Sequence, residues 1–301
     1  HIGNYLKKNG YKVIDEELAP SELNYNLHKK YGFSLYSARY GNIYTVKQLL
    51  QLAQEVAGER KPENYIWKKN GKYFDALRPA VEPEGRDTEK EVIEDRGFHI
   101  ERVKEVFKKM DLFIFTLGLT EMWVHKESGT VYPTAPGTIC GEFDEDIYDF
   151  KNANFLEIIN DFNKFQETVK KIRSNNKFKI LLTVSPVPLT ATASGKHVLV
   201  STVHSKSILR AVAGQLSTNQ GHIDYFPSFE IVNNPRLHLT AFKENLRTVR
   251  DETVEMVMKH FSREHPPIQR KKKFDPKIVN EKVKSQEDIQ CEEAILEAFG
   301  K

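Results

Sequence analysis

Two short segments of the chain place small and polar side chains directly after hydrophobic runs. Gly118-Leu119-Thr120-Glu121 follows one apolar run, and Ser185-Pro186-Val187-Pro188 follows the next. In an open parallel sheet, ligands bind beyond the carboxyl ends of the strands. A threonine hydroxyl there can donate a hydrogen bond, and a carboxylate can bind substrate hydroxyls or pair with an arginine. The same pattern also occurs where a strand simply ends in a loop, so periodicity alone leaves both interpretations open.

The apolar runs that precede these segments predict the strands that position them. Leu112–Leu117 is typical of a strand buried on both sides, Phe178–Val184 predicts a second buried strand, and Ile223–Phe226 predicts a third. Apolar stripes at helical spacing lie between and around them, near residues 103–110, 154–172, 205–216 and 254–261. Because alternating strands and helices indicate a parallel sheet covered on both faces, we predict a three-layer α/β/α sandwich of flavodoxin-like type.

The first hundred residues divide into two parts. Residues 1–56 predict a helix, a short strand, a loop and a second helix, and Thr45 with Gln48 predicts a capping box at the start of that second helix. Residues 57–97 are polar and interrupted by proline and glycine, which is typical of a surface excursion that carries binding loops.

Composition limits the classes of function. The 45 basic and 42 acidic residues are interspersed, which argues against a nucleic-acid partner, and no apolar run is long enough to cross a bilayer. Cys140 and Cys291 are too few for a disulfide framework or a zinc site, and they favour reduced thiols in the cytoplasm. No metal or cofactor motif is present. The printed sequence begins at His1 within a predicted helix, so we expect a preceding segment, and a signal peptide there stays open.

Residues 262–301 form a predicted charged tail after a domain over residues 1–261. The tail contains Pro266-Pro267 and the basic run Arg270–Lys273, which we interpret as a solvated linker. A short amphipathic helix is predicted near its end, over residues 289–299.

Several strings, taken in order, resemble those of the GSCFA family, which is similar to the SGNH (GDSL-like) hydrolase superfamily. The resemblance covers roughly residues 1–261, and its strings are Ala38–Thr45, Thr116–Trp123, Thr183–Leu189, Ser205–Arg210 and Tyr225–Glu230. It implies a serine esterase or acyltransferase. Residues 1–5 look like the continuation of the family's Gly-Ser-Cys-Phe-Ala string, so the resemblance implies a nucleophilic serine upstream of His1.

The resemblance also suggests which groups stabilise the oxyanion. Gly41 and Asn42 occupy the place of the superfamily's second conserved glycine, whose backbone N–H faces the oxyanion. Thr120 falls near a conserved asparagine that donates to the same oxygen, with Gly118 and Glu121 beside it. Ser185 is a poor substitute for the nucleophile because Pro186 removes the next backbone N–H.

The catalytic base is where the sequence departs from the superfamily. Its Asp-x-x-His pair corresponds to Asn245-Leu246-Arg247-Thr248, and neither an amide nor a hydroxyl can act as a general base near neutral pH. His204 and His238 are therefore the candidate bases, although a histidine in a loop is more often simply polar surface. Trp123 with Tyr132 can stack on a sugar ring or pack in the core.

We therefore predict an acyl-ester hydrolase or O-acyltransferase that acts on a small molecule, a glycan or another polyhydroxylated substrate. The alternative is a non-catalytic carbohydrate-binding or scaffolding protein on a degenerate SGNH fold, which the Asn245…Thr248 departure favours.

Overall fold

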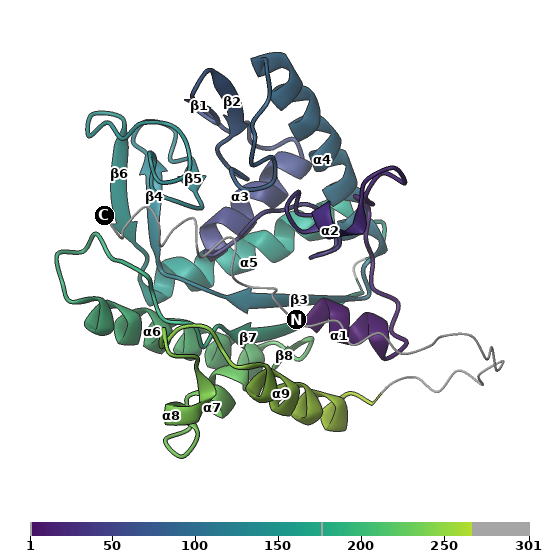
Figure 1. Cartoon of the computed structure of the whole chain (residues 1–301). Coiled ribbons are helices and arrows are strands. Elements are labelled where there is room, and N and C mark those ends of the chain that lie inside the picture. Colours follow the sequence, from purple (N-terminus) through teal and green to yellow (C-terminus); the bar gives the residue numbers. More distant parts are fainter. Residues whose placement is uncertain (1, 176, 267–301) are drawn as a thin grey trace.

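The computed structural model describes residues 2–175 and 177–266 (Figure 1). Cys291, the basic run Arg270–Lys273 and the helix predicted over residues 289–299 lie outside the described residues. No helix in the described part of the chain is both long and apolar enough to cross a membrane.

The centre of the molecule is a parallel sheet in the order β3-β7-β8. Its strands are β3 (Leu112–Leu117), β7 (Lys179–Val184) and β8 (Ile223–Tyr225), each within a residue of its predicted bounds. β3 and β7 are in register from Leu112 opposite Lys179 to Leu117 opposite Val184, so their carboxyl ends lie side by side.

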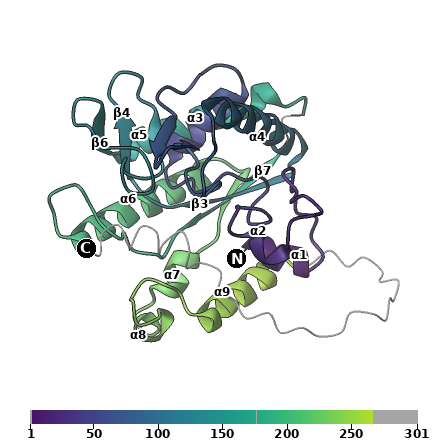
Figure 2. The ribbon, with the colours of Figure 1, turned by 45° about the horizontal axis from the view of Figure 1, so that its top comes forward.

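Helices cover both faces of this sheet, which confirms the predicted three-layer sandwich (Figure 2). On one face the core is formed by α3 (Val46–Val56), α4 (Glu89–Lys109), α5 (Phe155–Ile172) and α6 (Val198–Asn219). The other face is covered by α1 (Ile2–Lys8), α7 (Ser228–Val232), α8 (His238–Ala241) and α9 (Asp251–Glu264). Successive side chains of a strand point to opposite faces of the sheet. In β7, Leu181 therefore packs in the core on the side of α1 and α9, while Ile180 and Leu182 pack in the core on the side of α3 to α6.

Local capping residues fix where several helices begin. The predicted capping box of Thr45 and Gln48 is present at α3, and Asn154 with Glu157 forms another at α5. α6 differs from the prediction, since it begins at Val198 rather than near Ser205. Leu199, Val200 and Val203 in its first turns are exposed. These turns are fixed instead by hydroxyl groups, because Thr202 accepts from the Leu189 N–H and Ser201 is hydrogen-bonded to Ser194.

Two small antiparallel sheets were not predicted. β1 (Ile66–Lys69) and β2 (Lys72–Asp75) form a hairpin within the excursion over residues 57–97. β4 (Glu121–His125), β5 (Val131–Tyr132) and β6 (Tyr148–Asn152) form a sheet in the order β5-β4-β6 after β3. The Trp67 ring lies 4.9 Å from the Tyr132 ring in a tilted arrangement, and Tyr132 is 2% exposed, so Tyr132 is a core residue rather than a sugar-stacking platform. Trp123 lies opposite Tyr132 in the pairing of β4 with β5, and its ring contacts Phe143 and Phe150.

Three further expectations need correction or refinement. Among the described residues β3 pairs with β7 alone, and its Leu112 is 47% exposed, so β3 is not buried on both sides as predicted. The short strand expected within residues 1–56 is absent from the described part of that segment, which instead contains the short helix α2 (Tyr25–His28). α9 continues past residue 261 to Glu264, and the Tyr5 and Ser262 hydroxyls are hydrogen-bonded to each other.

Candidate functional site

The carboxyl ends of β3 and β7 bring the motif strings together. The Tyr44 carbonyl accepts hydrogen bonds from the backbone N–H groups of Gly118 (3.2 Å) and Leu119 (2.9 Å). The loop before α3 is therefore fixed directly against the end of β3, although more than seventy residues separate the two segments in sequence.

The start of the Ser205–Arg210 string is fixed to the same turn. The Ser205 hydroxyl accepts a hydrogen bond from the Thr120 N–H at 3.1 Å, and the Lys206 ammonium donates to the Gly118 carbonyl at 2.7 Å. Two adjacent residues of α6 therefore hold the short connection between β3 and β4.

The last two strings meet at the end of β7. The Ser185 N–H donates to the Leu117 carbonyl at 2.9 Å, which extends the ladder one residue beyond the strands. The Ser185 hydroxyl accepts from Val187, so Pro186 sits inside a small turn. Ser228, from the Tyr225–Glu230 string, shares a hydrogen bond with the Thr183 hydroxyl and donates to the Val184 carbonyl.

Gly118 permits the close approach of the Tyr44 loop. A Cβ atom at this position would lie 2.9 Å from the Tyr44 carbonyl oxygen, which is closer than ordinary contact allows. Replacing Gly118 by alanine is expected to lower the free energy of unfolding by about 1–3 kcal/mol, because backbone atoms must shift. Gly97→Ala in α4 is the matched control, since its Cβ meets nothing within 4 Å and alanine favours helix. Equal thermal stability of the two variants would contradict the prediction.

The candidate oxyanion donors differ in availability. Gly41 has a φ of +66°, and its N–H has no hydrogen-bond acceptor among the described residues. The carbonyl of its neighbour Asn42 accepts from Gln48. The N–H groups of Gly118 and Thr120 are already paired, and the Thr120 hydroxyl is completely buried with no partner in the described part of the chain. Gly41 and its neighbour Asn42 are therefore the members of this set whose backbone N–H groups have no acceptor among the described residues.

Glu121 lies at the head of a row of hydroxyl groups. It is 8% exposed and accepts a 2.8 Å hydrogen bond from Thr192. The Ser194 hydroxyl lies 2.8 Å from that of Thr192 and 2.9 Å from that of Ser201. Burial raises the pKa of Glu121, while the hydrogen bond from Thr192 and the nearby His204 act in the opposite direction. The His204 side chain itself is exposed on α6.

Lys206 is an ionisable residue of this edge to which sequence reasoning gave no role. Its side chain is almost completely buried, and burial, followed by the charge of Arg247, lowers its pKa to about 7. The sequence did carry a signal, because Lys206 shares helical spacing with the core residues Leu209 and Ala213 of α6. A lysine on a buried helix face is rare without a partner or a function.

Asn245–Thr248, the segment in which the sequence resemblance led us to look for a base, forms a turn with internal hydrogen bonds. Asn245 donates through its amide nitrogen to the Thr248 hydroxyl (2.8 Å), and its amide oxygen accepts from the N–H groups of Arg247 and Thr248. The turn contributes the Arg247 charge near Lys206 but no proton acceptor. His238 begins the short helix α8, and its side chain lies outside the described part of the structure.

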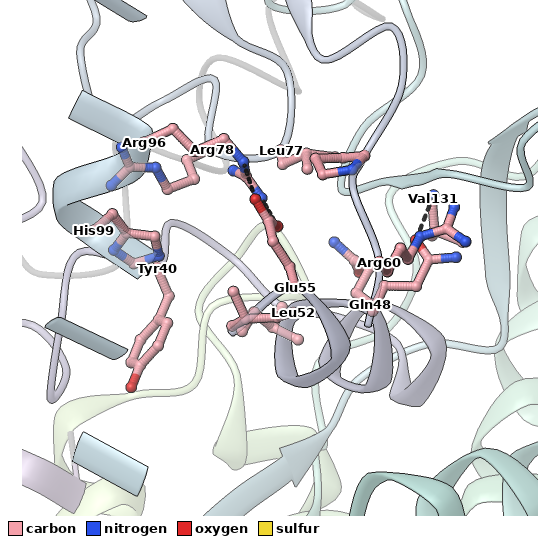
Figure 3. Close-up of a pocket in the computed structure, with 13 residues that line it drawn as sticks. Tyr40, Gln48, Leu52, Glu55, Arg60, Leu77, Arg78, Arg96, His99 and Val131 are labelled. Atoms are coloured by element: carbon pink, nitrogen blue, oxygen red, sulfur yellow. Dashed lines mark hydrogen bonds and ion pairs between the residues drawn. The ribbon is translucent and has the colours of Figure 1, made fainter. Parts of the chain in front are cut away.

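A second group of buried charges surrounds a small cavity between α3 and α4, and the sequence analysis missed it (Figure 3). Arg96 bonds to both Asp75 and Glu55, and Arg78 bonds to Asp75. His99 is bonded to the carboxylate of Glu17 at 2.6 Å. These side chains come from separate elements, so no local spacing pattern reveals the group. Arg78 also packs against Gly41, which connects this group to the candidate oxyanion loop.

No set of three metal-ligating side chains occurs within residues 2–175 and 177–266. In comparisons with known proteins, the GSCFA family model matches residues 1–261. No curated protein and no solved structure matches the chain.

Proposed function

The chain belongs to the GSCFA family, and on that premise we propose that it is an SGNH-like serine acyl-ester hydrolase or O-acyltransferase. The observation that carries the proposal is the convergence of the five motif strings at the carboxyl ends of β3 and β7. Three of the strings end neighbouring parallel strands and therefore meet by topology, whereas Ala38–Thr45 and Ser205–Arg210 reach the same edge through separate hydrogen bonds. This edge is where open parallel sheets bind ligands.

In this mechanism the nucleophile is the serine that the family resemblance places before His1. Its oxygen attacks the acyl carbonyl carbon, and the Gly41 N–H stabilises the negative oxygen of the tetrahedral intermediate. Departure of the alcohol leaves an acyl-enzyme, which water or an acceptor hydroxyl resolves.

The row of polar groups at Glu121 supports a polyhydroxylated substrate such as a glycan. Carboxylates and hydroxyls are matched to sugar hydroxyl groups, because each can exchange hydrogen bonds with them. Thr192 and Ser194 extend this row away from Glu121 along the segment before α6.

One observation favours the alternative, a non-catalytic carbohydrate-binding protein. Asn245 and Thr248 hydrogen-bond to each other, so the segment that supplies the base in related hydrolases supplies none here.

A fluorophosphonate probe separates these two functions. We expect the full-length protein to be labelled covalently on one serine, because only a serine with an activated hydroxyl attacks phosphorus rapidly. Peptide mass mapping then identifies the serine, and heat-denatured protein is the control. Absence of labelling in the native protein would overturn the hydrolase proposal and favour the binding protein.

A further inference from the structure

Lys206 is buried without a compensating charge. Its side chain is 3% exposed, and its ammonium group donates a 2.7 Å hydrogen bond to the Gly118 carbonyl. No carboxylate in the described part of the chain lies within ion-pair distance of its Nζ atom, whereas buried charges in proteins are normally paired. The charged group that faces it is Arg247, whose charge further disfavours a second cation.

These surroundings favour the neutral amine. Burial and the Arg247 charge lower the pKa of Lys206 to about 7, so an appreciable fraction of the side chain is unprotonated near neutral pH. A neutral amine has a lone pair that accepts a proton, and a general base is most effective when its pKa lies near the working pH.

We propose that Lys206 is the general base that takes the proton from the nucleophilic serine, the role that histidine performs in Ser-His enzymes. This role rests on the function proposed above. Its location supports it, because Gly118 is the first residue beyond β3 and lies where the motif strings meet.

The proton balance is simple. As the serine oxygen bonds to the acyl carbon, its proton passes to the neutral Nζ atom, which becomes an ammonium group. The ammonium then returns that proton to the leaving alcohol oxygen as the ester C–O bond breaks. The neutral amine next takes a proton from the water or acceptor hydroxyl that attacks the acyl-enzyme, and returns it to the serine oxygen.

Three of the described histidines fit this role less well. His204 is exposed on α6, and His222 directly precedes β8, at the amino end of the sheet. His99 lies in the separate group of buried charges with Glu17.

A purely structural role for Lys206 makes a different prediction from a catalytic one. In a structural role, the Lys206 side chain needs only to donate a hydrogen bond to the Gly118 carbonyl, which an arginine can also do. As a base, it must lose a proton, which an arginine in a protein does not do. Lys206→Arg therefore separates the two roles, and Lys206→Met removes both.

The test measures the rate of fluorophosphonate labelling of the full-length protein at pH 7. We expect Lys206→Arg and Lys206→Met to lower this rate by about 10²–10⁴-fold, the usual contribution of general-base assistance. Lys259→Arg, at an exposed position on α9, is the matched control and should label at the wild-type rate. His204→Ala and His238→Ala test the two histidines that the sequence offered as bases.

If the Lys206 variants do not fold, wild-type protein decides the question. Its labelling rate should rise with pH to a plateau, and the half-maximal rate should lie near the pH at which the ε-carbon resonance of Lys206 titrates by NMR.

The outcomes separate the two proposals. Labelled wild type with unimpaired Lys206→Arg overturns the role of Lys206 and leaves the proposed function standing. Loss of labelling in a histidine variant also overturns it and identifies the base. Wild type that is not labelled overturns the proposed function and this role together.

Discussion

Replacing Arg96 by methionine is expected to lower the free energy of unfolding by about 3–5 kcal/mol, because it leaves buried carboxylates without their partner. Arg96 bonds to Asp75 at 3.0 Å and to Glu55 at 2.8 Å, and its side chain is almost completely buried. Burial alone would raise the pKa of Asp75, but the charges of Arg96 and Arg78 bring it down to about 2. Urea denaturation at pH 7 measures the loss.

Arg263→Met is the matched control for this variant. Arg263 is exposed in the last turn of α9, so the same substitution there is expected to change the free energy of unfolding by about 0.5 kcal/mol or less. A loss below about 1 kcal/mol for Arg96→Met would contradict the prediction, since it would mean that Glu55 and Asp75 find water or other donors.

Acidification is expected to weaken the fold through His99. Burial and the charge of Arg78 lower the pKa of His99 to about 4, although its hydrogen bond with Glu17 acts in the opposite direction. The unfolded chain takes up the proton near the ordinary value of about 6.5, whereas the folded protein takes it up only near pH 4. The unfolded state thus binds more protons in this window, and stability falls as the pH falls through it.

The size of this effect follows from the two pKa values. Between pH 7 and pH 4 the wild-type protein should lose about 3 kcal/mol more stability than His99→Gln, which keeps a polar side chain but does not titrate. Other charged groups face His99, namely Glu17, Arg78 and Arg96, and all three are kept in both proteins. The measurement is a series of urea denaturations, with His260→Gln at an exposed position of α9 as the control. Parallel pH curves for wild type and His99→Gln would refute the prediction.

The parallel sheet and several helix ends were predictable because their signals are local. Apolar runs marked β3, β7 and β8 within a residue of their bounds, since a buried strand needs a continuous apolar segment. The capping box of Thr45 and Gln48 lies within four consecutive residues, so it is encoded wherever that helix packs.

The short antiparallel strands were not predictable in this way. β5 contains two residues, and its pairing with β4 depends on a loop that returns the chain to the same place. The start of α6 likewise contradicts local propensity, because hydrogen bonds of Ser201 and Thr202 to the preceding segment fix its first turns.

The features of the candidate site likewise fall into those that local sequence determines and those that depend on contacts between distant segments. The sequence by itself determined which segments end at the carboxyl edge of the sheet, because strand ends are local features. Only the tertiary structure decided that Lys206 is buried against Gly118, that the Thr120 N–H is occupied by Ser205, and that the Gly41 N–H is available. The physical reason is that the charge state and hydrogen bonding of a side chain depend on burial and on neighbours from distant segments, which no local spacing records.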